Sequence, residues 1–390
     1  MNATYQNTQI ALAICIMTQC PVILWGSPGV GKTAVLNALA KHYNMEMSTV
    51  ILSQREPSDL LGLPYIDKGE MQMSLPDFAN VLFDAHQNGR GSILFLDEYS
   101  TAPPSMQAAS LRLTAERMVG RGVRLPDSTV IVAAANPPSI ASAGSAITPP
   151  AANRFVHLPW DMPLDVLVGG LTLGWDPLQF PMIPPNFETV VDQVKQLIAA
   201  FLSSRGDNSF VSTDLESLES LGSHGSHFSP SDLAYPSPRM WVDYVAPVVA
   251  MSMFGSVNGK KIPTGVLKLL LEGTVGRGVG GEFLNFILHM DLPDPIPVLK
   301  GQSKWAASKD IRSDILSVVS YSFVNAYKTM PGKDAWIRCG DVLSTVATVR
   351  GDIALMPIKM WLKERPVGVM PSQTTVDILT PLVEEISKLK

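Results

Sequence analysis

The stretch WGSPGVGKT, residues 25–33, constrains the fold more than any other part of the chain. It fits the pattern G-x-x-x-x-G-K-[ST], and it lies between an apolar run, Val22–Trp25, and a helical pattern, Thr33–Tyr43. Glycines let successive backbone N–H groups close around phosphates, and a strand before and a helix after are the context that such a loop requires. Lys32 is expected to reach the β- and γ-phosphates, and the Thr33 hydroxyl to ligate Mg²⁺. The expected nucleotide-binding residues are Gly26, Ser27, Pro28, Gly29, Val30, Gly31, Lys32, Thr33 and Ala34.

The first 160 residues alternate short apolar runs with helical patterns, which predicts an α/β domain with a parallel sheet and helices on both faces. The central runs are almost entirely apolar, as buried parallel strands should be. The expected strands are Val22–Trp25, Thr49–Leu52, Ile93–Leu96, Thr129–Ala134 and Phe155–Leu158.

Beyond Trp160 the strand signals fade and helical patterns dominate. With 390 residues the chain is long enough for two or three domains. We expect a nucleotide-binding domain over residues 1–160, a helical domain over 161–290 with a polar loop at about 203–238, and a helical extension over 291–390. The expected helices of the two later regions are Thr189–Leu202, Arg239–Met253, Thr264–Leu271, Glu282–Met290, Asp310–Lys328, Ala335–Val349 and Thr374–Lys388.

Two polar groups follow apolar strands of the predicted sheet. SILFLDEYS, residues 92–100, places Asp97 and Glu98 at a strand's carboxyl end, where open α/β sheets bind ligands. Asp97 is expected to hold Mg²⁺ and Glu98 to polarise the attacking water. VIVAAANPP, residues 130–138, ends in Asn136, whose amide could position that water. The Asp-Glu pair favours nucleotide hydrolysis over phosphoryl transfer to an acceptor.

Two arginines are candidates for a contribution from a neighbouring subunit. Arg154 lies in PPAANRFVHLPW, residues 149–160, at the start of the last expected strand, and Arg239 opens a later helix in SPRM, residues 237–240. In a ring, Arg154 could project into a neighbour's phosphate site as an arginine finger, and Arg239 could reach the γ-phosphate from the helical domain. The rival finger candidates, around an expected hairpin at residues 117–126, are Arg112, Arg117 and Arg121.

Taken in order, these elements resemble the AAA+ ATPases and, among them, the MoxR group. The phosphate-binding loop and Asp97-Glu98 match generically. PSDLLG at 57–62, Asn136, NRF at 153–155 and SPR at 237–239 are more specific. The resemblance covers roughly residues 5–290. MoxR proteins often have LDRF where this chain has AANRF.

The resemblance implies a five-stranded AAA+ P-loop core of strand order 5-1-4-3-2, with an α-helical lid and additional C-terminal helices. It also implies a short insertion at about residues 62–75, formed as a small hairpin-like projection. The expected function is a ring-forming, Mg²⁺-dependent ATPase, usually hexameric, that binds ATP between subunits. Such a protein acts like a chaperone on a client, often with a von Willebrand factor A domain partner.

Two other functions are open. One is an ATP-gated scaffold with little turnover, and the other is a motor stimulated by nucleic acid. The composition, with 17% charged residues and a net charge of −5, gives no basic footprint for nucleic acid. The five candidate groups Asp97, Glu98, Asn136, Arg154 and Arg239 favour hydrolysis.

The remaining features predict no further chemistry. Ile10–Met17 is too short to span a bilayer, and Cys15, Cys20 and Cys339 lack metal-ligand spacing, so we expect buried thiols in a cytoplasmic protein with no membrane contact. GRGVGG at 276–281 has no strand before it and is expected to be a helix joint. His224 and His227 lack an acidic or cysteine partner, and Trp305, Trp336 and Trp361 are expected to pack a C-terminal core.

Overall fold

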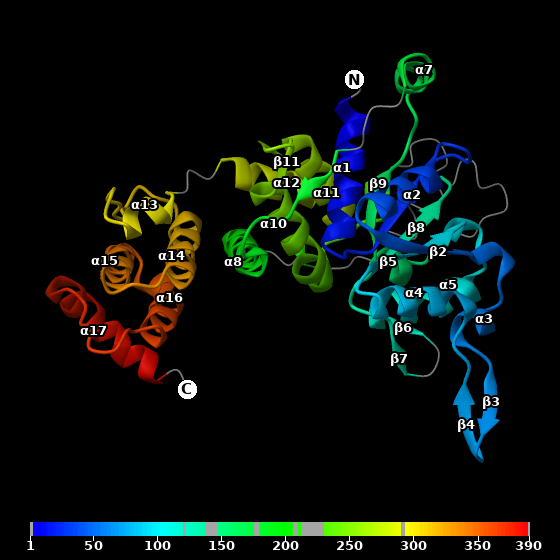
Figure 1. The fold of residues 1–390 in the computed structure, drawn as a ribbon. Helices are drawn as coiled ribbons and strands as arrows, with labels where there is room; N and C mark the ends of the chain where they lie inside the picture. Colours follow the sequence, from blue (N-terminus) through cyan, green and yellow to red (C-terminus); the bar gives the residue numbers. More distant parts are fainter. Residues whose placement is uncertain are drawn as a thin grey trace. The chain divides into compact units, whose positions relative to one another are not determined.

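The computed structural model describes residues 3–119, 122–137, 147–174, 179–205, 210–211, 230–289 and 293–388. The chain forms two compact units (Figure 1). The first unit comprises Met1–Phe187 and Val211–Leu284, and the second comprises Glu188–Phe210 and Asn285–Lys390. Of the expected polar loop at 203–238, residues 206–209 and 212–229 lie outside the described residues, and so do His224 and His227.

A five-stranded parallel sheet forms the centre of the first unit. All five expected strands are present, and their spatial order, β2-β5-β8-β1-β9, confirms the expected 5-1-4-3-2 arrangement when the strands are numbered along the chain. Each pairs in parallel with its neighbours, as in β1–β9, where Val22 is level with Val156. The strands are β1 (Val22–Trp25), β2 (Met45–Ile51), β5 (Gly91–Asp97), β8 (Thr129–Ala135) and β9 (Val156–Pro159).

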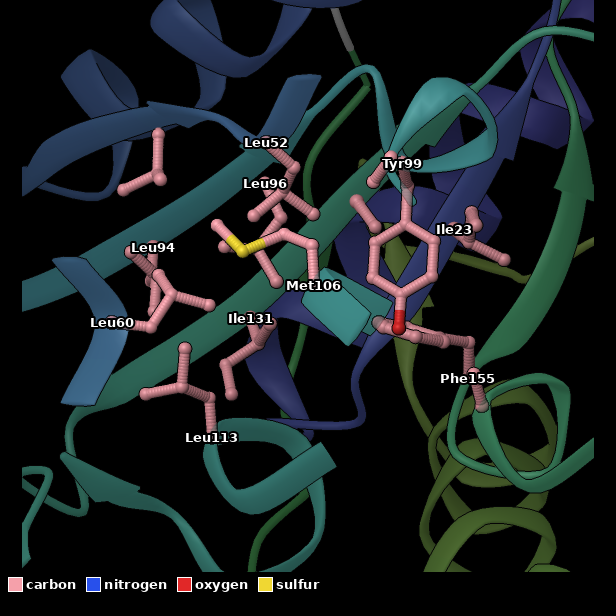
Figure 2. Close-up of a cluster of buried hydrophobic side chains, with 14 of the residues drawn as sticks. Ile23, Leu52, Leu60, Leu94, Leu96, Tyr99, Met106, Leu113, Ile131 and Phe155 are labelled. Atoms are coloured by element: carbon pink, nitrogen blue, oxygen red, sulfur yellow. The ribbon is translucent and has the colours of Figure 1, made fainter. Parts of the chain in front are cut away.

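One face of this sheet carries a hydrophobic core (Figure 2). Alternate strand residues point to the same face of a sheet, so Ile23, Leu94 and Ile131 lie together there. Met106 and Tyr99 cover them, and the Tyr99 hydroxyl is bonded to the Ser110 hydroxyl at 2.8 Å. The helices and turns on or near this face are η1 (Leu52–Gln54), α3 (Pro57–Leu61), α4 (Asp77–Gln87), η2 (Tyr99–Thr101), α5 (Pro104–Leu111), η3 (Arg112–Glu116) and α6 (Pro149–Ala152).

Helices from both ends of the first unit pack around β9. Helix α11 lies so close to the strand that an ideal Cβ at Gly273 would be 2.3 Å from the His157 carbonyl oxygen. His157 itself is buried, and burial lowers its pKa to about 4, so the ring is neutral and bridges Trp25 Nε1 (3.1 Å) and the Ala152 carbonyl (2.9 Å). The remaining elements of this unit are α1 (Ala3–Met17), α2 (Lys32–His42), α7 (Leu164–Leu173), β10 (Pro181–Met182), η5 (Pro230–Leu233), η6 (Met240–Val245), α10 (Ala246–Phe254), β11 (Ser256–Val257), β12 (Lys260–Lys261) and α11 (Thr264–Val275).

Two short antiparallel hairpins branch from the sheet connections. Residues 62–75 contain β3 (Pro64–Asp67) and β4 (Glu70–Met73), which project beyond the sheet (Figure 1). Backbone bonds close the base of this hairpin, where an ideal Cβ at Gly62 would be 2.0 Å from the Ser74 carbonyl. The second hairpin pairs β6 (Met118–Val119) with β7 (Val123–Arg124). The first lies within the insertion that the resemblance implies, and the second lies at the hairpin expected over residues 117–126.

The second unit is helical. At its centre Trp336 and Trp361 stack with ring centroids 4.2 Å apart, and each indole N–H donates to the other residue's carbonyl, at 3.1 and 2.9 Å. Trp305 packs against the same core, as expected from the sequence. The helices are α8 (Phe187–Arg205), α13 (Pro295–Leu299), α14 (Ser313–Thr329), α15 (Lys333–Val349), α16 (Gly351–Lys363) and α17 (Gln373–Lys388), while α12 (Arg277–Leu288) runs from the first unit into the second. The GRGVGG motif lies at the joint between α11 and α12, without a strand before it.

This core predicts a cost for adding volume at Gly340. An ideal Cβ there would be 2.4 Å from Trp361 Cζ2, and the indole is held by its two hydrogen bonds. We expect Gly340→Val to lower the free energy of unfolding by about 1–3 kcal/mol, as overpacking does. Urea titration of the full chain, followed by tryptophan fluorescence, measures this. Gly281→Val is the control, because that helical glycine has open space around it. Equal midpoints for the two variants would contradict the packing described here.

Candidate functional site

A cavity of about 420 Å³ opens at the carboxyl edge of the central sheet. Its walls come from the loop after β1 and the ends of β5 and β8, so groups far apart in the sequence meet at one edge because the strands are parallel. The lining residues are Pro28, Gly29, Val30, Gly31, Lys32, Thr33, Ala34, Asp97, Glu98, Ala134 and Asn136.

Three glycines give the loop its shape, each for a physical reason. Gly29 and Gly31 have φ of 80° and 85°, a region that other residues rarely adopt. Gly26 has no room for a side chain, because an ideal Cβ would be 1.9 Å from the Trp160 carbonyl oxygen. Trp160 also donates from Nε1 to the Val30 carbonyl at 3.2 Å. Trp160, directly after β9, therefore packs against the glycine loop and supports it.

Lys32 is held in place by the loop itself. Its Nζ donates to the carbonyls of Gly26 (2.6 Å) and Ser27 (3.1 Å). Gly26 and Ser27 thus contribute through these carbonyls and do not line the cavity. Burial lowers the pKa of Lys32, while the nearby carboxylates of Asp97 and Asp161 act in the opposite direction. An anionic phosphate in the cavity would compensate the partly desolvated ammonium group.

Glu98 sits in a left-handed backbone conformation, with φ of 57°, at the end of β5. Such a conformation is costly for a residue with a side chain, and here the Glu98 carbonyl accepts bonds from the Thr101 hydroxyl (2.9 Å) and Thr101 N–H (3.1 Å). The Glu98 carboxylate accepts a hydrogen bond from the Ser53 hydroxyl, which lies just beyond β2. Ser53 thereby occupies an oxygen of the carboxylate that the sequence indicates as the base.

Asn136 is placed by a buried serine. The Asn136 N–H donates to the Ser100 hydroxyl at 2.9 Å, and the Gly26 N–H donates to the Ala135 carbonyl at 3.1 Å. These bonds tie the ends of β8, β5 and the glycine loop to one another. The Asn136 side chain consequently lines the same cavity as Lys32 and Glu98.

The residues present fit a magnesium nucleotide. Thr33 supplies a hydroxyl and Asp97 a carboxylate to the same cavity, and oxygen ligands of these kinds suit Mg²⁺. The loop leads into the first turn of α2, where free N–H groups and the helix dipole favour phosphate.

Arg154 and Arg239 do not line this cavity. Arg154 lies two residues before Val156, and Gly26 lies four residues after Val22, with which Val156 pairs. At about 3.3 Å per residue, the start of β9 and the loop are therefore roughly 13 Å apart along the strands, and Arg154 lies in the turn that precedes β9. Arg154 is at the amino edge of the sheet and the cavity is at the carboxyl edge.

The segments that carry the two arginines are joined by hydrogen bonds. The Ser237 hydroxyl donates to the Asn153 side-chain oxygen (3.0 Å), and the Tyr244 hydroxyl donates to the Arg154 carbonyl (2.9 Å). Burial and the charge of nearby Arg239 lower the pKa of Arg154. Arg154 Nη1 donates to the Pro150 carbonyl, while its buried Nε has no hydrogen-bond partner among the described residues. NRF and SPR thus form one cationic site.

The rival arginines have different surroundings. The Arg117 guanidinium donates to the carbonyls of Pro126 (2.8 Å) and Thr129 (2.6 Å), so it fastens the second hairpin to the sheet. Arg112 is paired with Glu116 at 3.4 Å. Arg121 lies outside the described residues.

Comparison with known proteins assigns a family to the region that builds this cavity. Residues 21–155 match the family model described as the AAA domain of the dynein-related subfamily. The chain carries an AAA+ ATPase domain. The match spans both the glycine loop and Asp97-Glu98, so the ATPase assignment rests on the region that builds the cavity.

Solved structures similar to this AAA+ chain include two from microorganisms. A crystal structure assigned as an ATPase of Cytophaga hutchinsonii is 16% identical, with a TM-score of 0.43 over 73% of this chain and 91% of that one. A full-length MCM homologue of Methanopyrus kandleri is 14% identical, with a TM-score of 0.35 over 71% of this chain and 54% of that one. This chain therefore spans about half the length of the second structure.

Sequence reasoning missed the residues that position the AAA+ site from outside its motifs. Ser53, Ser100 and Trp160 have no distinctive local pattern, since each acts on a partner far along the chain. Among the three, only Trp160 has a position in the sequence that suggests a role, because it directly follows the last strand at the edge of the sheet where the cavity lies.

The contact between Ser53 and Glu98 predicts a kinetic effect. We expect Ser53→Ala to raise kcat for ATP hydrolysis about twofold to tenfold, which corresponds to a net hydrogen bond of about 0.5–1.5 kcal/mol. The reason is that a carboxylate oxygen engaged by Ser53 is unavailable to the attacking water. Steady-state phosphate release measures kcat, and nucleotide titration should show an unchanged Kd. Ser58→Ala, an exposed serine on α3 outside the cavity, is the control. If Ser53→Ala and Ser58→Ala have the same kcat, Ser53 has no influence on the Glu98 carboxylate during hydrolysis.

Proposed function

We propose that this protein is a ring-forming, Mg²⁺-dependent ATPase of the MoxR type, which uses ATP hydrolysis to remodel or assemble a partner protein. The observation that carries the proposal is the separation of the site into two halves. Lys32, Glu98 and Asn136 lie at one edge of the sheet, and the linked Arg154 and Arg239 lie at the other.

The cavity provides one half of a hydrolytic site. Lys32 and the loop N–H groups would bind the phosphates, and Asn136 would orient the attacking water. Glu98 would accept a proton from that water through its carboxylate. Thr33 and Asp97 would hold Mg²⁺, which when bound supplies positive charge to the phosphate oxygens.

The arginine pair provides the other half, in a neighbouring subunit. Arg154 and Arg239 repel one another, as the lowered pKa of Arg154 indicates, and an anionic phosphate would turn this repulsion into attraction. Arg239 is exposed, and Arg154 Nε is without a partner among the described residues. Because both lie far from the cavity of their own chain, a second copy is the natural source of that phosphate.

A head-to-tail arrangement follows from this geometry. An interface that joins two different surfaces of the same chain closes into a ring when the rotation permits. The MoxR resemblance favours a hexamer, and it favours a von Willebrand factor A domain protein as partner. The three cysteines are buried and free, which is consistent with a cytoplasmic protein. Among the described residues, no helix combines the length and hydrophobicity that crossing a bilayer requires.

Replacing the base tests hydrolysis directly. We expect Glu98→Gln to bind ATP with unchanged affinity and to lose about 10²–10⁴-fold in kcat, the usual contribution of a general base. Phosphate release and nucleotide titration measure the two quantities. Glu188→Gln, an exposed glutamate at the start of α8, is the control and should behave like the wild type. An ATPase as fast as the wild type in Glu98→Gln, or a wild-type protein that binds ATP without turnover, would favour the ATP-gated scaffold.

Mixing two inactive variants tests whether the arginines act between subunits. Lys32→Ala disables the cavity and Arg154→Ala disables the arginine site, so each alone should be inactive. In randomly mixed rings about a quarter of the interfaces would join an intact cavity to an intact arginine site, because the contact is heterologous. We therefore expect partial recovery of phosphate release on mixing.

The controls for mixing are the two variants alone and an equal mixture of Lys32→Ala with Lys32→Ala,Arg154→Ala, which contains no intact cavity. Recovery confined to the first mixture supports the shared site. No recovery under conditions in which the wild type is active and assembled would place Arg154 outside catalysis, or in its own chain's site.

A further inference from the structure

Helix α7, Leu164–Leu173, is apolar around most of its circumference, with Asp165 and Thr172 together on one side, and yet it has no buried residue in the described structure. Its sequence, LDVLVGGLTL, contains six Leu or Val residues, two glycines, one aspartate and one threonine. The side chains of Leu164, Leu171 and Leu173 are 75%, 74% and 91% exposed. In Figure 1 the helix stands clear of the central sheet, of which β9 is the edge strand.

Such a helix needs a partner. A wide apolar surface on a helix is normally buried against another element, and a helix of ten residues is marginal in water by itself. Gly169 and Gly170 weaken it further. Exposed apolar surface of this kind marks an interaction site.

The position of α7 links this contact to the nucleotide cavity. The helix follows β9 after four residues of connection, Trp160 to Pro163, and these residues border the glycine loop. Trp160 supports Gly26, the charge of Asp161 acts on Lys32, and the Met162 methyl is 3.8 Å from an ideal Cβ at Gly31. Helix α7 is thus anchored at the rim of the half-site.

We propose that α7 is the docking helix for a second copy of this chain, which packs its arginine-bearing face against it. The inference rests on the ring function proposed above. A second copy is the occupant that the cavity itself requires, because the arginines that complete it must arrive at the rim where α7 is anchored. The contact on α7 continues that shared site outward.

The neighbouring copy offers a matching surface on the side that carries its arginines. In η6 and the residue before it, Arg239, Val242 and Asp243 are exposed, while Met240, Trp241 and Tyr244 are buried. Val242, 53% exposed, follows Arg239 by three residues in the same helical segment. An apolar side chain next to the arginine that must enter the neighbour's cavity suits an apolar docking helix.

Substitution on α7 tests the proposal in the full-length protein. We expect Leu171→Glu to abolish the assembled species in sedimentation velocity with ATP and Mg²⁺, and to lower ATPase activity about a thousandfold or more, as loss of a trans arginine does. The Kd of the monomer for ATP should stay within about twofold, because the cavity is intact. Met356→Glu, on exposed α16 surface of the second unit, is the control and should assemble and hydrolyse ATP like the wild type.

A photo-crosslinker in place of Leu171 identifies the occupant. With ATP bound, we expect crosslinks between two copies that map to the segment from Ser237 to Phe254, and a crosslinker in place of Met356 should give none there. Crosslinks only within one copy, or only to a different protein, would overturn the proposal. An assembled and active Leu171→Glu protein would also overturn it while leaving the ring function in place, provided that Arg154→Ala is inactive. A wild-type protein that is monomeric and without ATPase activity would instead overturn the ring function itself.

Discussion

The common direction of the five central strands is the constraint on which the rest of the first unit depends. Because β1, β5 and β8 all end at the same edge, their polar end groups meet in one cavity. The same polarity places Trp160 at the cavity end of β9 and Arg154 at its other end. A single strand therefore supports one half of the proposed site and presents the other half to a neighbour.

Close packing at the cavity end of β9 supports the glycine loop. The Trp160 carbonyl occupies the space where Gly26 would carry a side chain, and its indole is bonded to Val30. Beneath it, Trp25 donates to His157, whose neutral ring donates in turn to Ala152. The loop is thus supported by a network with satisfied polar groups. Preorganised donors lose little entropy when an anion binds.

The sequence predicted most of what local chemistry dictates. The glycine loop was visible because Gly29 and Gly31 adopt backbone angles that exclude other residues, and the strands were visible because buried parallel strands are continuously apolar. Asp97, Glu98 and Asn136 followed from the strand ends. The stacking of Trp336 on Trp361 agreed with the expected C-terminal core, although their reciprocal hydrogen bonds have no sequence signal.

Long-range placement could not be predicted in this way. Ser53 is 45 residues from Glu98, and nothing near it in the sequence marks the contact. Arg154 and Arg239 were identified separately, but their proximity depends on how Ser237 and Tyr244 bond to the loop before β9. Helix α7 was not predicted, because apolar residues and two glycines occupy most of its circumference and leave little helical period. The expected domain boundaries at 160 and 290 stay predictions, and the compact units divide the chain at different residues.

The link between the two arginine segments gives the proposed ring a thermodynamic property. Holding Arg154 beside Arg239 costs free energy in the isolated chain, since the like charges are partly desolvated. A phosphate supplied by a neighbour offsets that cost, so nucleotide binding favours assembly. Linkage then requires the reverse, that assembly strengthens nucleotide binding by the same factor. Because Ser237 and Tyr244 join the helical segment to the arginine loop, any change in phosphate charge at the interface acts on both together. Loss of the γ-phosphate after hydrolysis would therefore change the electrostatic interactions of the neighbouring subunit's helical segment. In the proposed ring, hydrolysis in one subunit could shift the conformation of the next in this way.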